Sequence, residues 1–488
     1  MTKTGQGALA ILAASFMTAA VGTSAAQAQS FKSLHGFAGT PDGDSPTYGS
    51  LIQATNGDLY GATVSGGANG NGTVFKITAN GALTTVYSFC SESTCGQNPN
   101  AGLVQASNGN FYGTTSTGGT NTVGTVFKMT PGGTVTTLHS FCSQSGCADG
   151  STPFGGLVQG ANGDFYGTTN TGGIGGAGTV FKIAPSGTLT TLHHFVGADG
   201  DGPFAGLVQA ANGDFYGTTE SGGAHSSGTV FEITPAGKFT MLYSFCAQGG
   251  IACTDGAYPY AGLVQGTDLN FYGTTFNGGV STNCGGQGCG SVFQITPAGA
   301  LTTIYSFCSQ YAFPLCLDGL VPYGGVIQAT DGKLYGATNS GGANNGGTVF
   351  HITLSGTLTT LYDFCAVSQC KDGYMALSAL TQDTNGKLYG TTSAGGASND
   401  GTVFSLSMGL GAFVETRPAS GKVGAAVKIL GTSLTGATGV SFNGVAAVFT
   451  VVSASEIATT VPTGATTGTI EVTTPVSTLS SNVQFQVQ

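Results

Sequence analysis

The sequence predicts an all-β protein, and its composition and its repeat pattern lead to this prediction. The chain has 488 residues, of which 85 are glycine, and only 7% are charged. Glycine is tolerated where φ must be positive, as in the tight turns between short strands. The glycines show no three-residue period, which excludes collagen, and the residues typical of long helices do not dominate. Because 40% of the residues are hydrophobic, the chain can form a packed core.

One sequence pattern returns seven times, and it predicts the blades of a β-propeller. The clearest copy spans residues 206–245, with strand signals at 207–209, 215–219, 229–233 and 239–245. An Asn-Gly or Asp-Gly pair, a strong hairpin signal, joins the first two strands in most copies. Four short antiparallel strands in a repeat of about 50 to 60 residues are typical of a propeller blade. A Tyr-Gly step marks every copy, and its tyrosines are Tyr60, Tyr112, Tyr166, Tyr216, Tyr272, Tyr335 and Tyr389.

The two ends of the repeat array predict a closed ring. The seventh copy stops after residues 402–406 and lacks a fourth strand, whereas residues 31–37 look like a fourth strand without its first three. We therefore expect the N-terminal strand to complete the last blade, which leaves no open sheet edges. The prediction is a seven-bladed β-propeller over residues 29–408, with a β-solenoid as the alternative.

The chain changes character near residues 409–411, where the Tyr-Gly motif and the cysteines stop. From there to residue 488, short Val/Thr/Ile segments alternate with glycine turns. This pattern predicts a small Ig-like β-sandwich over residues 411–488.

The first 28 residues have the features of a secretory signal peptide. Lys3 precedes an apolar run at residues 8–21, and Ala26-Gln27-Ala28 forms an A-x-A cleavage pattern. The run is shorter than the roughly 20 residues that a transmembrane helix needs, and no later segment is suited to span a bilayer. We expect an exported protein in the periplasm, on the cell surface or outside the cell.

The twelve cysteines fall into close pairs, which in an oxidising compartment predict local disulfides. Zinc or iron–sulfur ligation is the alternative, but it would favour C-x-x-C spacings. The predicted pairs are Cys90 with Cys95, Cys142 with Cys147, Cys246 with Cys253, Cys284 with Cys289, Cys308 with Cys316, and Cys365 with Cys370.

Two resemblances to known families follow from these motifs. Phe-Tyr-Gly-Thr-Thr followed by Gly-Gly and Gly-Thr-Val-Phe, as at residues 165–181 and 215–231, resembles the GloVer tandem-repeat family of exported bacterial proteins, across residues 31–408. That resemblance implies surface or extracellular placement. Residues 411–488 resemble an IPT/TIG immunoglobulin-like domain through segments 427–431 and 440–444. Such a domain implies a spacer or a binding module.

The charge of the chain excludes one class of partner, and its long loops indicate where a ligand binds. The formal net charge is −10 with 12 basic residues, so we expect no nucleic-acid binding, which needs a basic surface. The cysteine pairs lie in the longer connections, which share one face of a propeller. Loops held by a rigid scaffold commonly carry binding residues.

Two sets of side chains on this face are candidate ligand-binding groups. Five aspartates recur at one loop position, and they are Asp149, Asp199, Asp255, Asp318 and Asp372. They predict either a ring of carboxylates for Ca²⁺, a cationic ligand or a sugar, or side chains that cap their own turns. Tyr260 and Tyr323, with Tyr48, Phe154 and Phe204, are candidates for an aromatic platform.

The sequence favours a binding or scaffold protein over an enzyme. It contains no G-x-S-x-G, H-E-x-x-H or phosphate-loop motif, and we expect no catalytic residue and no cofactor, with Ca²⁺ as the alternative. The expected partner is an extracellular glycan or protein. The alternative function is an extracellular carbohydrate-active enzyme that uses carboxylates on the long-loop face, with Glu220 as a lone candidate acid.

Overall fold

The computed structural model describes residues 29–46, 48–249 and 253–488, and the predicted signal peptide lies outside them. Within these ranges the only helical elements are two short 3₁₀ turns, η1 (Ser145–Cys147) and η2 (Ser368–Cys370). The prediction of an all-β protein is therefore confirmed. No helix in this part of the chain has the length and apolar character needed to cross a membrane.

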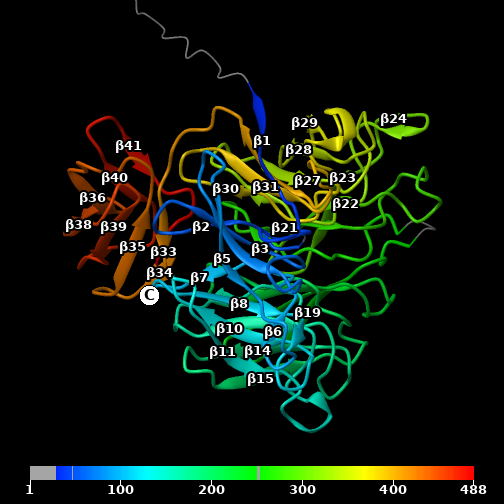
Figure 1. Ribbon diagram of the computed structural model, residues 1–488, viewed down its shortest axis with the longest axis horizontal. Helices are drawn as coiled ribbons and strands as arrows, with labels where there is room; N and C mark the ends of the chain where they lie inside the picture. Colours follow the sequence, from blue (N-terminus) through cyan, green and yellow to red (C-terminus); the bar gives the residue numbers. More distant parts are fainter. Residues whose placement is uncertain (1–28, 47, 250–252) are drawn as a thin grey trace, which may run out of the picture.

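Each copy of the repeat forms one four-stranded antiparallel sheet, and the described residues contain seven such sheets (Figure 1). Sheet 1 contains β2 (Ile52–Gln53), β3 (Leu59–Thr63), β4 (Thr73–Ile77) and β5 (Leu83–Ser88). Sheet 2 contains β7 (Val104–Gln105), β8 (Phe111–Thr115), β10 (Thr125–Met129) and β11 (Val135–Ser140). Sheet 3 contains β12 (Val158–Gln159), β13 (Phe165–Thr169), β14 (Thr179–Ile183) and β15 (Leu189–His194). Sheet 4 contains β16 (Val208–Gln209), β17 (Phe215–Thr219), β18 (Thr229–Ile233) and β19 (Phe239–Ser244).

The remaining sheets of the repeat follow the same order of strands. Sheet 5 contains β20 (Val264–Gln265), β21 (Phe271–Thr275), β22 (Ser291–Ile295) and β23 (Leu301–Ser306). Sheet 6 contains β26 (Ile327–Gln328), β27 (Leu334–Ala337), β28 (Thr348–Ile352) and β29 (Leu358–Asp363). Sheet 7 contains β30 (Thr381–Gln382), β31 (Leu388–Thr392), β32 (Thr402–Ser407) and β1 (Ser30–Gly36). Two small two-stranded pairs lie in the loops: β6 (Gly96–Gln97) with β9 (Thr117–Gly118), on either side of β7 and β8, and the hairpin of β24 (Tyr311–Ala312) with β25 (Leu315–Cys316).

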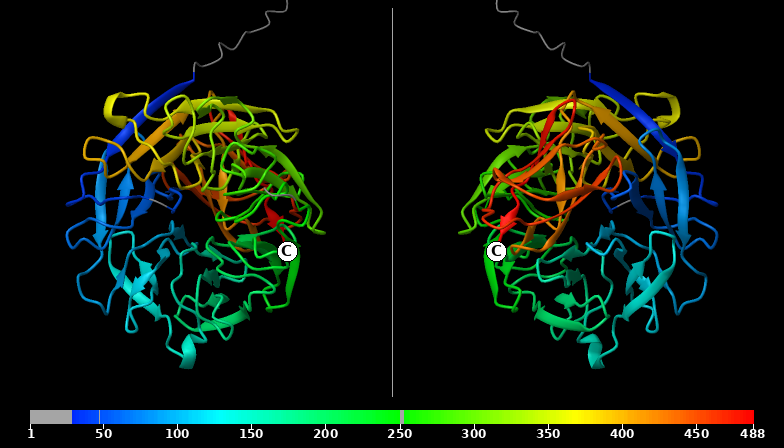
Figure 2. Two further views of the ribbon diagram at one scale, coloured as in Figure 1. Left: turned by 90° about the vertical axis from the view of Figure 1, so that its right-hand side faces the viewer. Right: turned by 90° about the vertical axis from the view of Figure 1, so that its left-hand side faces the viewer.

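The first and last segments of the repeat region pair with each other. Strand β1 runs antiparallel to β32, with Ser30 opposite Ser407 and Gly36 opposite Thr402. Figure 2 shows the sheets following one another in chain order around a common centre, from blue to orange. The resulting arrangement is propeller-like.

A glutamine in each first strand links neighbouring sheets. Its Oε1 atom accepts a hydrogen bond from a backbone N–H of the sheet before it, at N···O distances of 2.8 to 3.2 Å. The last of these bonds joins sheet 7 to sheet 1, because the N–H of Thr384 donates to Gln53. The seven bonds therefore form a continuous circle through the chain. The glutamines are Gln53, Gln105, Gln159, Gln209, Gln265, Gln328 and Gln382.

Aromatic side chains fill the space between the sheets. Tyr216 of sheet 4 stacks on Phe271 of sheet 5 with ring centroids 4.0 Å apart, and Tyr60, Tyr112 and Tyr166 stack in the same way on the following sheets. The glycine of the Tyr-Gly step leaves room for a third ring, because a Cβ at Gly217 would lie 2.6 Å from Cζ of Phe231. Each buried phenylalanine stabilises the fold by about 1.5–3 kcal/mol before chain entropy is subtracted. The repeated motif is therefore a packing motif.

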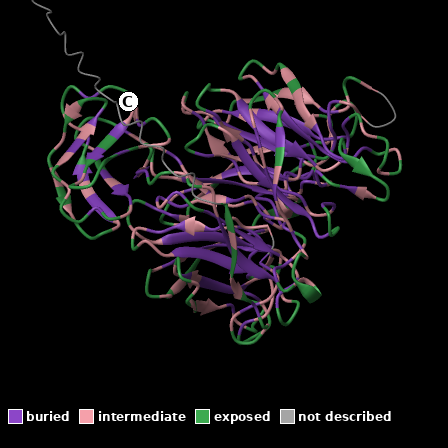
Figure 3. Ribbon diagram, turned by 90° about the horizontal axis from the view of Figure 1, so that it is seen from above, coloured by how far each residue is buried: buried purple, intermediate pink, exposed green. Residues whose placement is uncertain are grey.

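The C-terminal residues form two further four-stranded sheets that enclose an apolar core. One sheet contains β33 (Glu415–Arg417), β35 (Ala426–Leu430), β39 (Glu456–Thr460) and β38 (Phe449–Val451). The other contains β37 (Val445–Ala446), β36 (Gly439–Phe442), β40 (Ile470–Thr473) and β41 (Thr478–Ser480), and β34 (Ser420–Gly421) pairs with β42 (Gln486–Val487). Figure 3 shows buried residues running through both parts of the molecule.

The C-terminal sheets lie against the short turns that join the first two strands of sheets 7 and 1. The N–H of Phe413 donates to the carbonyl of Thr384, and Oγ of Ser455 donates to the carbonyl of Thr55 at 2.8 Å. The opposite face of the repeat region carries the long, disulfide-bearing loops.

Six disulfides close short loops on that opposite face, and each joins two cysteines that are five to eight residues apart in the sequence. The pairs are those expected from the sequence, so thiolate ligation of zinc or of an iron–sulfur cluster, the alternative, does not apply to them. The bonds join Cys90 to Cys95, Cys142 to Cys147, Cys246 to Cys253, Cys284 to Cys289, Cys308 to Cys316, and Cys365 to Cys370.

Candidate functional site

The five repeated aspartates lie in the disulfide-bearing loops, and each carboxylate is bonded within its own repeat. The Asp149 carboxylate, which is fully buried, accepts hydrogen bonds from Nε2 of His139 at 2.9 Å and from the N–H groups of Ser143 and Gln144. The same pattern joins Asp199 to His193, Asp255 to Tyr243, Asp318 to Tyr305, and Asp372 to Tyr362, each with one or two loop N–H groups. The structure does not bring these carboxylates together.

Hydrogen bonding sets the protonation of Asp149. Burial by itself would raise the pKa of this carboxyl group. Bonds from the Ser143 hydroxyl, the His139 ring and two backbone N–H groups outweigh burial and hold the pKa below its usual value. The carboxylate is thus a charged acceptor that orders the turn after the fourth strand.

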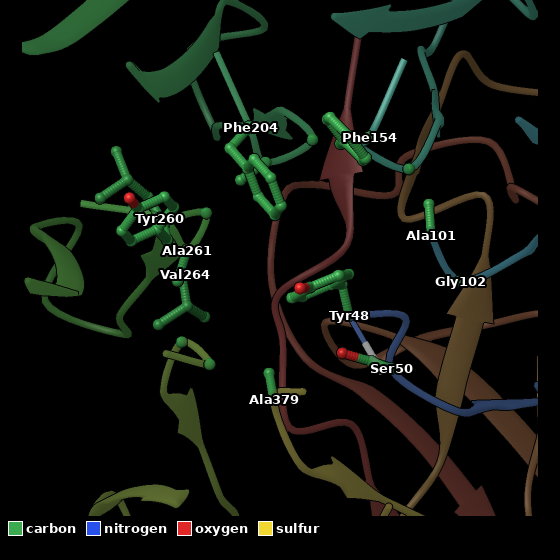
Figure 4. Close-up of a pocket in the computed structure, with 18 of the residues that line it drawn as sticks. Tyr48, Ser50, Ala101, Gly102, Phe154, Phe204, Tyr260, Ala261, Val264 and Ala379 are labelled. Atoms are coloured by element: carbon green, nitrogen blue, oxygen red, sulfur yellow. The ribbon is translucent and has the colours of Figure 1, made fainter. Parts of the chain in front are cut away.

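Five aromatic side chains gather at the centre of the sheets, and we call them the aromatic collar. They are Tyr48, Phe154, Phe204, Tyr260 and Tyr323. Four of them directly follow a proline, just before the first strand of their sheet. Figure 4 shows Tyr48, Phe154, Phe204 and Tyr260 entering a common space from different parts of the chain. The structure brings together the two predicted tyrosines, because the rings of Tyr260 and Tyr323 stack on each other.

The rings of the collar contact one another across the centre. Phe154 stacks on Phe204 and Tyr260 stacks on Tyr323, both with centroids 4.7 Å apart. Tyr48 meets Phe204 and Tyr323 at 5.2 Å, so sheet 1 reaches sheets 4 and 6. Such offset and edge-to-face pairs are stabilising beyond the burial of their area. All five side chains are still partly exposed, which leaves ring surface free for a ligand.

A cavity of about 370 Å³ adjoins the collar along the first strands. Pairs of small residues line it, because neighbouring loops approach closely there: a Cβ at Gly155 would lie 2.6 Å from the carbonyl carbon of Ala205. Among the described residues, the polar side chains in the lining are Ser50 and the three tyrosines of the collar. No charged side chain of the described residues contributes to it. The cavity suits an uncharged group with apolar faces.

The collar is open at sheet 2, where the repeat has no aromatic residue. Asn100 takes that place and donates a hydrogen bond to Oγ of Ser116 at 2.6 Å. Ala101 and Gly102 then border the cavity on this side (Figure 4). At sheet 7 the corresponding residue is Leu377. The centre of the molecule is therefore less symmetric than the sheets around it.

Glu220 lies beside the collar, at the position directly after the second strand of sheet 4. The equivalent residue of sheet 5 is Phe276, whose ring lies 5.3 Å from that of Tyr260 and 5.7 Å from that of Tyr323. Burial, and next to it the negative charge of Asp201, raise the pKa of Glu220. Burial also raises the pKa of Tyr260, and the charge of Glu220 adds to this effect. The sequence marks Glu220 as a candidate acid, but its position next to the collar was not predicted. The signal in the sequence is its alignment with Phe276, an aromatic residue that contacts the collar.

One further group of side chains has the spacing of a metal site. The sulfur atoms of Cys284, Cys289, Cys308 and Cys316 lie within 4.8 Å of one another. They are paired as two adjacent disulfides, Cys284–Cys289 and Cys308–Cys316. Because disulfide sulfurs are not thiolates, this group is not a metal site. Each bond closes its own loop, and the two disulfides pack in one apolar cluster.

The fold and the site define a propeller-like, disulfide-bearing β-protein with an aromatic cavity at its centre. The family model of the Gloeobacter/Verrucomicrobia repeat matches residues 20–159, 95–286 and 251–448. The chain belongs to this repeat family, as the resemblance of its Tyr-Gly motifs indicated. No curated protein matches the chain.

Several solved structures are similar to the chain at low identity. The BP39L lectin from Burkholderia pseudomallei is 11% identical, with 74% of this chain and 95% of that chain covered and a TM-score of 0.46. An auxiliary nutrient binding protein from Bacteroides ovatus is 12% identical, with 75% and 70% covered and a TM-score of 0.39. A puromycin hydrolase is 12% identical, with 72% and 50% covered and a TM-score of 0.40.

Proposed function

We propose that this chain is an exported binding protein that holds an extracellular glycan at its aromatic collar. Its scaffold is a seven-bladed β-propeller, closed by the N-terminal strand over residues 29–408, and residues 411–488 form an IPT/TIG-like module. The pairing of β1 with β32 and the circle of glutamine hydrogen bonds support the closed ring. Six disulfides support export, because such bonds persist in oxidising compartments.

The observation that carries the function is the convergence of five aromatic rings on a cavity without charged lining. Binding pockets are typically apolar and aromatic, with a few polar groups that orient the ligand. A pyranose ring has apolar C–H faces and hydroxyls at its edge, so it suits aromatic faces next to the tyrosine hydroxyls. The volume of about 370 Å³ lies in the range of small-ligand pockets.

A glycan screen with collar variants tests this proposal. We expect Phe204→Ala to weaken glycan binding about 10- to 100-fold, because the contact of one buried aromatic ring contributes about 1.5–3 kcal/mol. The matched control is Phe313→Ala, which removes an 86% exposed ring from the same face, away from the collar. Equal affinity of the Phe204→Ala variant and the wild type for every bound glycan would show that the ligand lies elsewhere.

A second candidate function is glycan hydrolysis, and Glu220 is the observation that favours it. A half-buried carboxyl group with a raised pKa is a typical general acid. Hydrolysis needs a second carboxylate at about 5–10 Å. Asp201, whose charge acts on Glu220, is the neighbouring carboxylate, but neither acid lines the cavity. Turnover of a polysaccharide that is lost in Glu220→Gln would replace the binding proposal with this one.

A further inference from the structure

Sheet 4 departs from the repeat at two positions that meet beside the collar. The residue after the second strand donates its N–H to a loop carbonyl in every sheet, and in sheet 4 Glu220 donates to Gly202 at 3.0 Å. The other sheets carry a side chain at this acceptor position, namely Ser45, Asn98, Thr152, Tyr258, Val321 and Met375. The acid and the glycine therefore occur together in one sheet only.

The glycine opens space for two polar side chains. A Cβ at Gly202 would lie 3.1 Å from Nδ2 of Asn170 and 3.2 Å from Oε1 of Glu220. Any larger residue would crowd both groups. The backbone does not explain the glycine, because the six equivalent residues carry side chains at similar positive φ values of 53° to 60°. The Asn170 amide thus comes from sheet 3 and the Glu220 carboxylate from sheet 4, and both converge on Gly202.

Neither polar group is satisfied within the protein. Nδ2 of Asn170 is buried and has no hydrogen-bond partner among the described residues. The Glu220 side chain takes part in none of the ion pairs or side-chain hydrogen bonds found in that part of the chain. A partly desolvated carboxylate without a partner is costly, and Asp201 adds negative charge next to it. A ligand that supplies positive charge would relieve both effects.

The aromatic rings next to Glu220 specify the kind of cation. Phe276, which holds the position of Glu220 in sheet 5, lies 5.3 Å from the ring of Tyr260 and 5.7 Å from that of Tyr323. The charge of Glu220 also contributes to the raised pKa of both tyrosines, so their phenol groups lie within its electrostatic reach. A carboxylate next to aromatic faces suits an organic ammonium group, which gains both ion pairing and cation–π contacts. A hard metal ion such as Ca²⁺ needs six to eight oxygen ligands, and aromatic rings supply none.

We propose that Glu220 and Asn170 form a subsite for an ammonium group, so that the glycan bound at the collar carries free amines. The Glu220 carboxylate pairs with the ammonium, and Nδ2 of Asn170 donates a hydrogen bond to a ligand oxygen. The net charge of −10 also favours a cationic ligand during encounter. This inference rests on the proposed function, because it uses the collar as the place where the sugar rings stack.

Calorimetry in mildly acidic buffer with two tetrasaccharides of the same backbone tests the ammonium subsite. One is the glucosamine tetramer, which is cationic, and the other is the N-acetylglucosamine tetramer, which is neutral. We expect the wild type to bind the glucosamine tetramer at least about tenfold more tightly, with an affinity that falls as salt is added. The isosteric Glu220→Gln variant should lose this preference and keep the affinity for the neutral tetramer.

The control is Glu92→Gln, which removes the same charge from an exposed loop position on the same face. It should leave the preference unchanged. If both tetramers bind the wild type equally, the ammonium subsite is refuted while the glycan proposal stands. If neither binds, the glycan proposal and the subsite fail together for this class of ligand. Cleavage of either tetramer that Glu220→Gln abolishes would make Glu220 a catalytic acid and overturn its role as a binding group.

Discussion

Asp383 stands where the other six repeats carry alanine or glycine, and replacing it should stabilise the protein at neutral pH. The equivalent residues are Ala54, Ala106, Gly160, Ala210, Gly266 and Ala329. Asp383 is only 2% exposed and lies near the segment that enters the C-terminal sheets. Burial, with a smaller contribution from the negative charge of Glu415, raises its pKa from 3.8 to about 6.

The size of the effect follows from this shift. The folded protein holds the Asp383 proton more tightly than the unfolded chain, so stability falls as the pH rises from about 4 to about 6. A shift of roughly two pKa units corresponds to about 3 kcal/mol of unfolding free energy at neutral pH. Asp383→Asn removes the titration, and its side-chain oxygen can still accept the N–H of Asn385, which now bonds to Oδ1 at 3.0 Å. We expect the variant to be more stable than the wild type by up to this amount.

Urea unfolding of both proteins across a pH series measures the difference. The gain should be full near pH 8 and should disappear below about pH 4, where Asp383 is protonated in both states. The control is Asp331→Asn: hydrogen bonds and the charge of Lys333 outweigh burial and lower the pKa of Asp331, so this variant should lose stability at neutral pH. A difference for Asp383→Asn that does not change with pH, or that has the opposite sign at pH 8, would refute the reasoning.

Three further predictions concern the scaffold. Asp149→Ala should lower the unfolding free energy by about 2–3 kcal/mol at neutral pH, because His139 and two loop N–H groups lose a buried charged acceptor. The pKa of Asp149 is lowered in the folded protein, so denaturation curves at a series of pH values should show this loss of stability shrinking as the pH falls through that pKa. Removal of residues 29–37 should expose the edge of β32 and the core contacts of Phe37, so light scattering should show aggregation; a monomer with unchanged cooperativity would contradict ring closure. Reduction with dithiothreitol should lower Tm but keep the β circular dichroism signal, because loops with a separation of five to eight residues contribute only about 2 kcal/mol each; loss of that signal at room temperature would mean that the disulfides hold the sheets.

The sequence could not decide whether the side chains of the repeated aspartates face a ligand or their own turns. Their regular position on the long-loop side suited a ring of ligand-binding carboxylates as well as turn caps. In the structure Asp149 and Asp318 are fully buried, and each accepts hydrogen bonds from the fourth strand and the following loop. A repeat reproduces the local turn, so local bonds recur from copy to copy, whereas a ligand site needs groups from different copies to converge.

The local chemistry of the chain determined its strands, its turns, the pairing of its cysteines and the residues that pack between sheets, because these depend on neighbours close in sequence. The stacking of Tyr216 on Phe271 in the next sheet follows from the same repeat. Only the tertiary structure decided that Tyr48 meets Phe204 and Tyr323 at the centre, and that Asn170 and Glu220 converge on Gly202. Those contacts join different sheets, and their geometry depends on how the sheets are arranged around the centre, which no single repeat encodes.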